Sequence, residues 1–315
     1  LQTLFFTVGM QYNKKIINFS AMTVYAGMLI FFFVVLLSDV KITTEAFSNI
    51  FNLNNFLDVN NLAPLLTVAG TIFAYFSILI ISFGDFSRYV KNEQELKKGN
   101  LSLILNLIIF SFLSVFIVIG SDVFLNQKFS DIDRIFTNPT DIVGKFDNIQ
   151  ITIVVLFFII IASASTNLVA NFIPSQYSLI NFAPSILSLK SASYLIAFFG
   201  LLIAIFWLTI LSQIGILSFV DTFGAFFGPL FGVMAADYYL IKNQELSNKD
   251  LYSIDKESAY YYSGGWHIKG VYSLILGFIF SASTIWNTNL MFLQSYAWII
   301  GAFVAWITYY LLAKK

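Results

Sequence analysis

The chain has 315 residues, of which 58% are hydrophobic and 11% charged, and its formal net charge is zero. A soluble domain carries ~25% charged residues, so this composition excludes a water-soluble globule, and the 18% of aromatic residues excludes a disordered chain. With no cysteine and one histidine, disulfides, iron–sulfur clusters and multi-histidine metal sites are excluded, and no cofactor is expected. The neutral charge balance argues against nucleic acid as a partner.

Long apolar runs recur from one end of the chain to the other. A transmembrane helix needs ~20 apolar residues, whereas a strand of a membrane barrel needs only ~9–11 residues of alternating polarity, which is absent here. The runs predict a stub at 1–12 and eight full spans, at 19–38, 63–87, 101–122, 149–172, 191–211, 214–241, 269–286 and 295–312. The sequence therefore predicts an all-α multi-pass membrane protein with one transmembrane domain over residues 1–315. Because the chain opens on a leucine inside an apolar segment, we expect a fragment without its N-terminus.

The positive charges predict how these spans are oriented. Of the 17 lysines and arginines, all but four lie in one alternate set of loops, and the four exceptions are Lys41, Lys128, Arg134 and Lys145. Cytoplasmic loops carry the excess of positive charge. The polar loop 242–267 is therefore predicted to be cytoplasmic, the loop 126–148 is predicted to be extracytoplasmic, and the protein is expected in the cell membrane.

Polar residues gather in the second half of the span 149–172. Asn167 and Asn171 are four residues apart and so share one helical face, while Ser165 and Thr166 lie to its side. Polar groups are costly in lipid and tend to be functional there. Hydroxyl and carbonyl oxygens suit a cation such as Na⁺, and paired amides suit a planar polar ligand. Close helix packing through small polar residues is the structural alternative, and the pattern alone leaves both open.

Two other polar patterns have simpler interpretations. Asp85 and Arg88 are three residues apart at the end of a span, which predicts an ion pair at the cytoplasmic membrane edge. Gly224, Gly228 and Gly232 recur every four residues, which favours close helix packing, and Pro229 offers a kink as the functional alternative. The sequence contains no GxSxG, HExxH or Walker motif, so an enzyme is not expected.

Four motifs in order resemble the nucleobase–cation symporter-1 family, which includes hydantoin, allantoin, uracil and cytosine permeases. They are Asp85-Phe86-Ser87-Arg88-Tyr89, then Ser165-Thr166-Asn167 followed by Asn171, then Gly228-Pro229 through Asp237-Tyr238-Tyr239, and finally Leu251-Tyr252 with Tyr260 through Trp266. The resemblance implies a LeuT-type fold with two inverted five-helix repeats. On that map the chain runs from the end of helix four through helix twelve, and helices one to three and most of helix four are missing.

The resemblance also implies the site residues. Phe76 corresponds to the aromatic that stacks on a flat substrate, and here Ala74 and Tyr75 precede it where many members have glycine, which argues against the usual break in that helix. The implied substrate-binding residues are Phe76, Tyr75, Asn167 and Asn171. The implied sodium ligands are the carbonyl of Ala162 and the hydroxyls of Ser165 and Thr166.

The leading hypothesis is a secondary active transporter that imports a small planar nitrogen heterocycle with a cation, expected to be Na⁺, by alternating access around a midplane site. Its motifs look nearer the hydantoin, allantoin and uracil branch than the cytosine branch. An amino-acid or osmolyte transporter of the same fold and a non-transporting integral membrane protein are the alternatives, and H⁺ remains open as the coupling ion. The expected partners are the heterocyclic substrate and the lipid bilayer, and a monomer is expected.

Overall fold

The computed structural model describes residues 3, 10–38, 40–52, 54, 58–128, 149–207, 216–251, 253 and 255–314. Throughout these residues the regular elements are helical, apart from one isolated bridge between Ser263 and Trp266. Most of the predicted stub, most of the predicted loop 126–148, residues 208–211 of one predicted span and Tyr252 lie outside the described residues. The contacts divide the chain into two compact units, residues 1–58 with 85–201 and residues 59–84 with 202–315.

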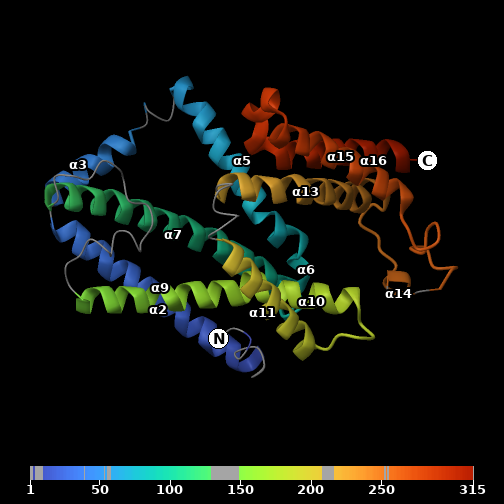
Figure 1. The fold of residues 1–315 in the computed structure, drawn as a ribbon, viewed down its shortest axis with the longest axis horizontal. Coiled ribbons are helices and arrows are strands. Elements are labelled where there is room, and N and C mark those ends of the chain that lie inside the picture. The colour runs from blue at the N-terminus through green and yellow to red at the C-terminus, as the bar shows by residue number, and fades with distance from the viewer. Residues whose placement is uncertain are drawn as a thin grey trace. The chain divides into compact units, whose positions relative to one another are not determined.

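The first unit is built around three long helices (Figure 1). Helix α2 (Met10–Ser38) packs against α7 (Glu93–Lys128) and α9 (Ile149–Asn167), and α3 (Val40–Ile50) packs against α7. Its remaining elements are the π-turn η1 (Leu168–Phe172), α10 (Ile173–Phe182) and two helices that cross the boundary between the units, α6 (Phe83–Ser87) and α11 (Leu189–Phe206). Aromatic rings fill the contact of α3 with α7: the Phe47 ring lies 4.9 Å from that of Phe116.

The second unit is a bundle in which α13, α15 and α16 lie side by side (Figure 1). Helix α13 (Ile216–Ala236) packs against α5 (Val59–Ile81), α15 (Ile268–Trp286) and α16 (Ala297–Ala313). The π-turn η3 (Asp237–Ile241) extends α13, α14 (Asn248–Leu251) lies in the following loop, and the 3₁₀ segment η4 (Thr288–Tyr296) joins α15 to α16.

Seven helices of the described residues are long and apolar enough to span a membrane: Val59–Ile81, Glu93–Ser121, Thr152–Phe182, Leu189–Phe206, Phe219–Ile241, Ile268–Trp286 and Thr288–Ala313. They coincide with seven of the eight predicted spans, and the eighth falls within α2, where Ile17–Phe33 forms a shorter apolar stretch. The prediction of an all-α multi-pass membrane protein is confirmed. The boundary predicted at residue 172 was wrong, since the helix continues to Phe182 with Pro174 in the first turn of α10, where a missing N–H is tolerated.

The glycines of α13 pack as predicted. A Cβ atom on Gly228 would lie 2.3 Å from the backbone oxygen of Trp298, and one on Gly232 would lie 2.1 Å from that of Ala302. Helix α16 therefore approaches α13 more closely than any side chain at these positions would permit. Pro229 is fully buried at the same contact, and α13 continues through it to Ala236.

Candidate functional site

A hollow on α9 and η1 brings together three of the predicted site residues. Its volume is about 570 Å³. It is lined by Ile159, Ile160, Ser163, Ala164, Thr166, Asn167 and Asn171. We call it the asparagine hollow. Nδ2 of Asn171 donates a hydrogen bond to Oδ1 of Asn167 at 2.6 Å, which confirms that the two amides share a face. Asn171 keeps its second N–H and its carbonyl oxygen available for a ligand.

The backbone under the asparagine hollow is a π-turn rather than an α-helix. The N–H of Ile173 bonds to the carbonyl of Leu168, five residues earlier. Pro174 follows directly and has no N–H to give to the carbonyl of Ala170. A π-turn inside a long helix is often found at functional sites because it shifts side chains around the axis. Leu168 and Phe172, which directly follow the two asparagines, are buried on the neighbouring face and pack there with Ile173, which holds this part of the helix in place.

The predicted sodium ligands divide between two directions around α9. Thr166 is exposed and lines the asparagine hollow. Ser165 is half-buried, and its Oγ donates a hydrogen bond to the carbonyl oxygen of Ala162 at 3.1 Å. Successive residues of a helix point ~100° apart, which is why only one of the two adjacent hydroxyls lines the hollow.

The predicted stacking residue lies in the second unit, on α5. This helix is continuous from Val59 to Ile81, so it has no break beside Phe76. Phe76 is half-buried and meets the ring of Tyr75 edge-on, with 5.2 Å between the ring centroids, while Tyr75 itself is 64% exposed. The buried face of α5 holds Ala74 and Ser77, and Ala74 packs against Gly224 of α13.

The predicted ion pair after α5 is present. Arg88 Nη2 lies 3.5 Å from Asp85 Oδ1. The Arg88 guanidinium also lies over the ring of Tyr177 on α10, 4.4 Å from its centroid, and Tyr89 hydrogen-bonds to the Tyr177 hydroxyl. Burial and the Tyr177 hydroxyl raise the pKa of Tyr89 above the usual tyrosine value. This motif therefore joins α6 to α10 through a cation–π contact in addition to anchoring a helix end.

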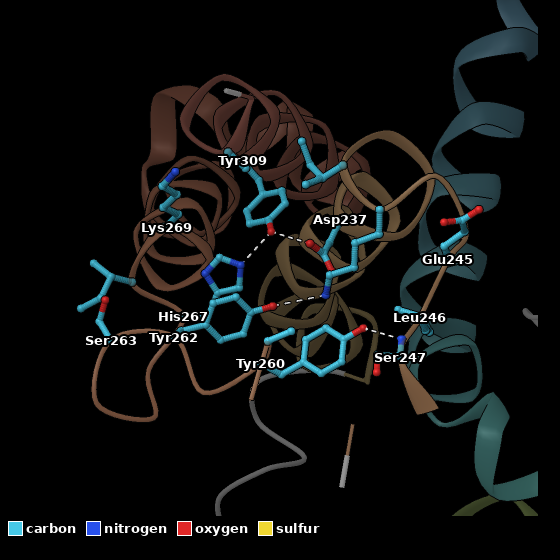
Figure 2. Close-up of a pocket in the computed structure, with 15 residues that line it drawn as sticks. Asp237, Glu245, Leu246, Ser247, Tyr260, Tyr262, Ser263, His267, Lys269 and Tyr309 are labelled. Carbon is cyan, nitrogen blue, oxygen red and sulfur yellow. Dashed lines mark hydrogen bonds and ion pairs between the residues drawn. The ribbon is translucent and has the colours of Figure 1, made fainter. Parts of the chain in front are cut away.

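A second polar cluster, shown in Figure 2, lies at the end of α13 in the second unit. Lys242 Nζ forms a 2.7 Å ion pair with Asp237 Oδ2, and the Tyr309 hydroxyl donates to Asp237 Oδ1 at 2.6 Å. Lys242 also donates to the Tyr262 hydroxyl at 3.2 Å, and the Tyr262 ring stacks on His267 at 3.9 Å. We call these five residues the Asp237 cluster. They border a cavity of about 640 Å³.

The hydrogen-bond order of the Asp237 cluster fixes the histidine tautomer. His267 Nε2 lies 2.7 Å from the Tyr309 oxygen. Because the Tyr309 hydroxyl gives its proton to Asp237, its oxygen must accept from Nε2–H of His267. Burial lowers the pKa of His267, which keeps the ring neutral. Burial also opposes the charge of Lys242, but the bonds from Asp237 and Tyr262 outweigh it and raise the pKa of Lys242.

Sequence reasoning did not find this cluster, although its parts belong to the last two motifs. Asp237 and Lys242 are five residues apart. In an α-helix two such residues point to different faces, but the wider π-turn η3 places them on the same face. Nothing in the sequence paired Tyr309 with Asp237, because the two lie 72 residues apart and Tyr309 is one of several aromatic residues on α16.

We predict that the thermal stability of the protein falls as the pH drops below about 6.5. The pKa of His267 is lowered from 6.5 in the folded state, so in this range the unfolded chain binds the proton more tightly. His267→Gln, which keeps an N–H donor for Tyr309, should remove that part of the pH dependence. Unfolding temperatures in detergent from pH 8 to 5 measure it, and identical pH profiles for both proteins would contradict the assignment.

The comparisons with known proteins agree with these motifs. A family model described as a permease for cytosine/purines, uracil, thiamine and allantoin matches residues 2–310. An allantoin permease of Bacillus subtilis (strain 168) is 28% identical over 244 residues, which cover 77% of this chain and 48% of the relative. A purine-uracil permease NCS1 of Arabidopsis thaliana is 25% identical over 255 residues, which cover 77% of this chain and 41% of the relative.

A hydantoin permease of Microbacterium maritypicum is 29% identical over a shorter stretch of 144 residues, 45% of this chain and 28% of the relative. The chain spans about half the length, or less, of the curated relatives that it matches. No solved structure matches it.

Proposed function

The chain belongs to the family of permeases for cytosine/purines, uracil, thiamine and allantoin, and from this premise we propose that its protein imports a small planar nitrogen heterocycle of the nucleobase, hydantoin or allantoin type. The motif resemblance to the nucleobase–cation symporter-1 family is confirmed. The protein is a multi-pass cell membrane protein, and its relatives are permeases rather than enzymes.

The asparagine hollow is the observation that supports this substrate class best. A primary amide offers a donor and an acceptor in one plane, which matches the N–H and C=O edge that nucleobases and hydantoins share. The bond from Asn171 to Asn167 orients the Asn171 amide. We propose that Asn171 binds this edge, that Asn167 positions it, and that Phe76, with Tyr75 at its edge, stacks on the ring face.

We further propose that a sodium ion drives the import. The Ala162 carbonyl oxygen and the Ser165 hydroxyl oxygen lie 3.1 Å apart, a spacing at which both can contact one cation. Thr166 lines the hollow on the adjoining side of α9, and in this proposal its hydroxyl turns toward the pair as a third ligand when the ion binds. Alternating access of a LeuT-type fold would expose the site to each side in turn. We also propose that residues 1–315 form one transporter domain and that the protein is a monomer.

Uptake into proteoliposomes tests the substrate class. The protein that carries this chain is reconstituted and given labelled uracil, allantoin, hydantoin or cytosine under an inward sodium gradient, with proline and glycine betaine as alternative substrates. Saturable uptake of one of the heterocycles, abolished when the gradient is collapsed, is expected. Uptake of proline or betaine alone would instead favour an amino-acid or osmolyte transporter.

We predict that Thr166→Ala raises the sodium concentration needed for half-maximal uptake roughly tenfold or more. A hydrogen bond or ligand contact to a charged group contributes ~1.5–3 kcal/mol, and ~1.4 kcal/mol is a factor of ten. The order of preference among substrates should stay the same. Ser163→Ala is the matched control, since Ser163 lines the same hollow but is not a proposed ligand. An unchanged sodium requirement in Thr166→Ala would move the ion site elsewhere.

A further inference from the structure

Asp221 is a carboxylate buried inside a membrane-spanning helix. It lies five residues into α13, within the span Phe219–Ile241, and is only 2% exposed. Ionisable residues at such positions are costly and are generally functional. Nothing in the proposed substrate or sodium site uses it, since those residues lie on α5, α9 and η1.

The surroundings of Asp221 are polar on one side only. Oδ2 accepts a hydrogen bond from Nε2 of Gln294 on η4 at 3.2 Å. The hydroxyl of Thr71 on α5 is the second polar neighbour of the carboxyl group. Oδ1 is buried and makes no hydrogen bond to any residue that the structure describes.

Helices packed around α13 bring no charge to Asp221. The sequences of α5 and η4 contain no Asp, Glu, Lys, Arg or His, and their titratable groups are Tyr75 and Tyr296. On α15 and α16 the titratable groups lie toward the Asp237 cluster, and they are Lys269, Tyr272, Tyr309 and Tyr310. Asp237 itself is 16 residues farther along, ~24 Å at the helical rise.

An isolated ionised carboxylate in such a place costs far more than a neutral one, so it is expected to hold a proton. A metal cation fits less well. The N–H of Gln294 already points at Oδ2 and would repel it, and the described residues contain no group of three acidic or histidine side chains that could hold a metal. We propose that Asp221 is a proton-binding site, separate from the sodium site on α9, that is loaded and emptied during the transport cycle.

The segment η4, whose Gln294 covers Asp221, can move. Gln294 belongs to a 3₁₀ segment none of whose residues is buried, and 3₁₀ hydrogen bonds are weaker than α-helical ones. In the orientation that the positive charges predict, η4 faces the extracytoplasmic side, with Asp221 ~8 Å below the start of α13. Displacement of η4 would admit water. While η4 is displaced, the carboxylate takes one proton from the external aqueous phase, η4 then covers the neutral acid, and the acid returns that proton to water later in the cycle.

The proposal rests on the proposed transport function, and proteoliposomes with a pH dye inside test both. For the wild-type protein we expect substrate influx to carry protons inward and an external pH drop to accelerate uptake. Asp221→Asn should reduce proton influx per substrate at least tenfold, while substrate counterflow, which needs no gradient, continues. Asp221→Glu should restore proton influx. Asp255→Asn, an exposed carboxylate of the loop, is the matched control and should behave as wild type.

Each other outcome gives a distinct answer. Equal proton influx in wild type and Asp221→Asn would overturn the proposal, as would sodium-driven uptake with no proton movement, and both would leave the transport function standing. If no heterocycle is transported, the proposed function fails by itself. The proton site is then decided by infrared spectroscopy of the purified protein at pH 7. A carboxylic-acid C=O band that disappears in Asp221→Asn supports the site, and a spectrum unchanged by that substitution rejects it.

Discussion

Replacing Asn171 with alanine is expected to weaken substrate binding roughly five- to 150-fold, because loss of a buried hydrogen bond costs ~1–3 kcal/mol. Leucine at this position should be more damaging, since it also fills the space beside Asn167 and cannot bond to it. Equilibrium binding of labelled uracil, allantoin and hydantoin to purified protein measures the effect. Asn100→Leu, at an exposed position on α7, is the control for a general effect of the substitution.

Phe76 should share in this effect. Phe76→Ala is expected to cost a comparable factor through lost stacking, and Phe76→Trp to be tolerated because tryptophan offers a larger flat face. Combining Phe76→Ala with Asn171→Ala tests whether both contact one ligand. Residues that contact one ligand couple, whereas distant ones are additive within ~0.3–0.5 kcal/mol. If the binding free-energy changes of the two single variants simply add up in the double variant, or if Phe76→Ala leaves the affinity unchanged, Phe76 does not belong to the substrate site.

Gly232→Ala is expected to lower the unfolding temperature by roughly 2 to 6 °C, because overpacking costs ~1–3 kcal/mol and each kcal/mol lowers the unfolding temperature of a long chain by ~2 °C. The new Cβ would lie 2.1 Å from the Ala302 oxygen, and a backbone atom cannot turn aside as a side chain can. Gly228→Ala should act similarly. The measurement is thermal unfolding in detergent.

Gly200→Ala is the matched control for this series. Its new methyl group would meet nothing within 4 Å, and alanine in an open helical position is ~0.5–1 kcal/mol more favourable than glycine. This variant should therefore unfold at or slightly above the wild-type temperature. If Gly232→Ala also unfolded at the wild-type temperature, α13 and α16 would have to lie farther apart than described.

Much of this protein is determined by local sequence. Long apolar runs must become helices in lipid, because only there is every backbone N–H and C=O bonded within the segment, so hydropathy alone predicted the spans. Helical spacing likewise placed Asn167 beside Asn171 and Asp85 beside Arg88. The glycine repeat of α13 predicted a close contact without naming its partner.

Tertiary structure decided what spacing cannot encode. Gln294, which donates a hydrogen bond to Asp221, lies 73 residues from it, and Tyr309, which donates one to Asp237, lies 72 residues from it. A periodic pattern says which face of a helix is buried, but it carries no information about which other helix covers that face. Packing of other helices therefore decided the uncharged surroundings of Asp221 and brought Tyr309 to Asp237, whereas the charge of Lys242 reaches Asp237 through the local π-turn of the same helix.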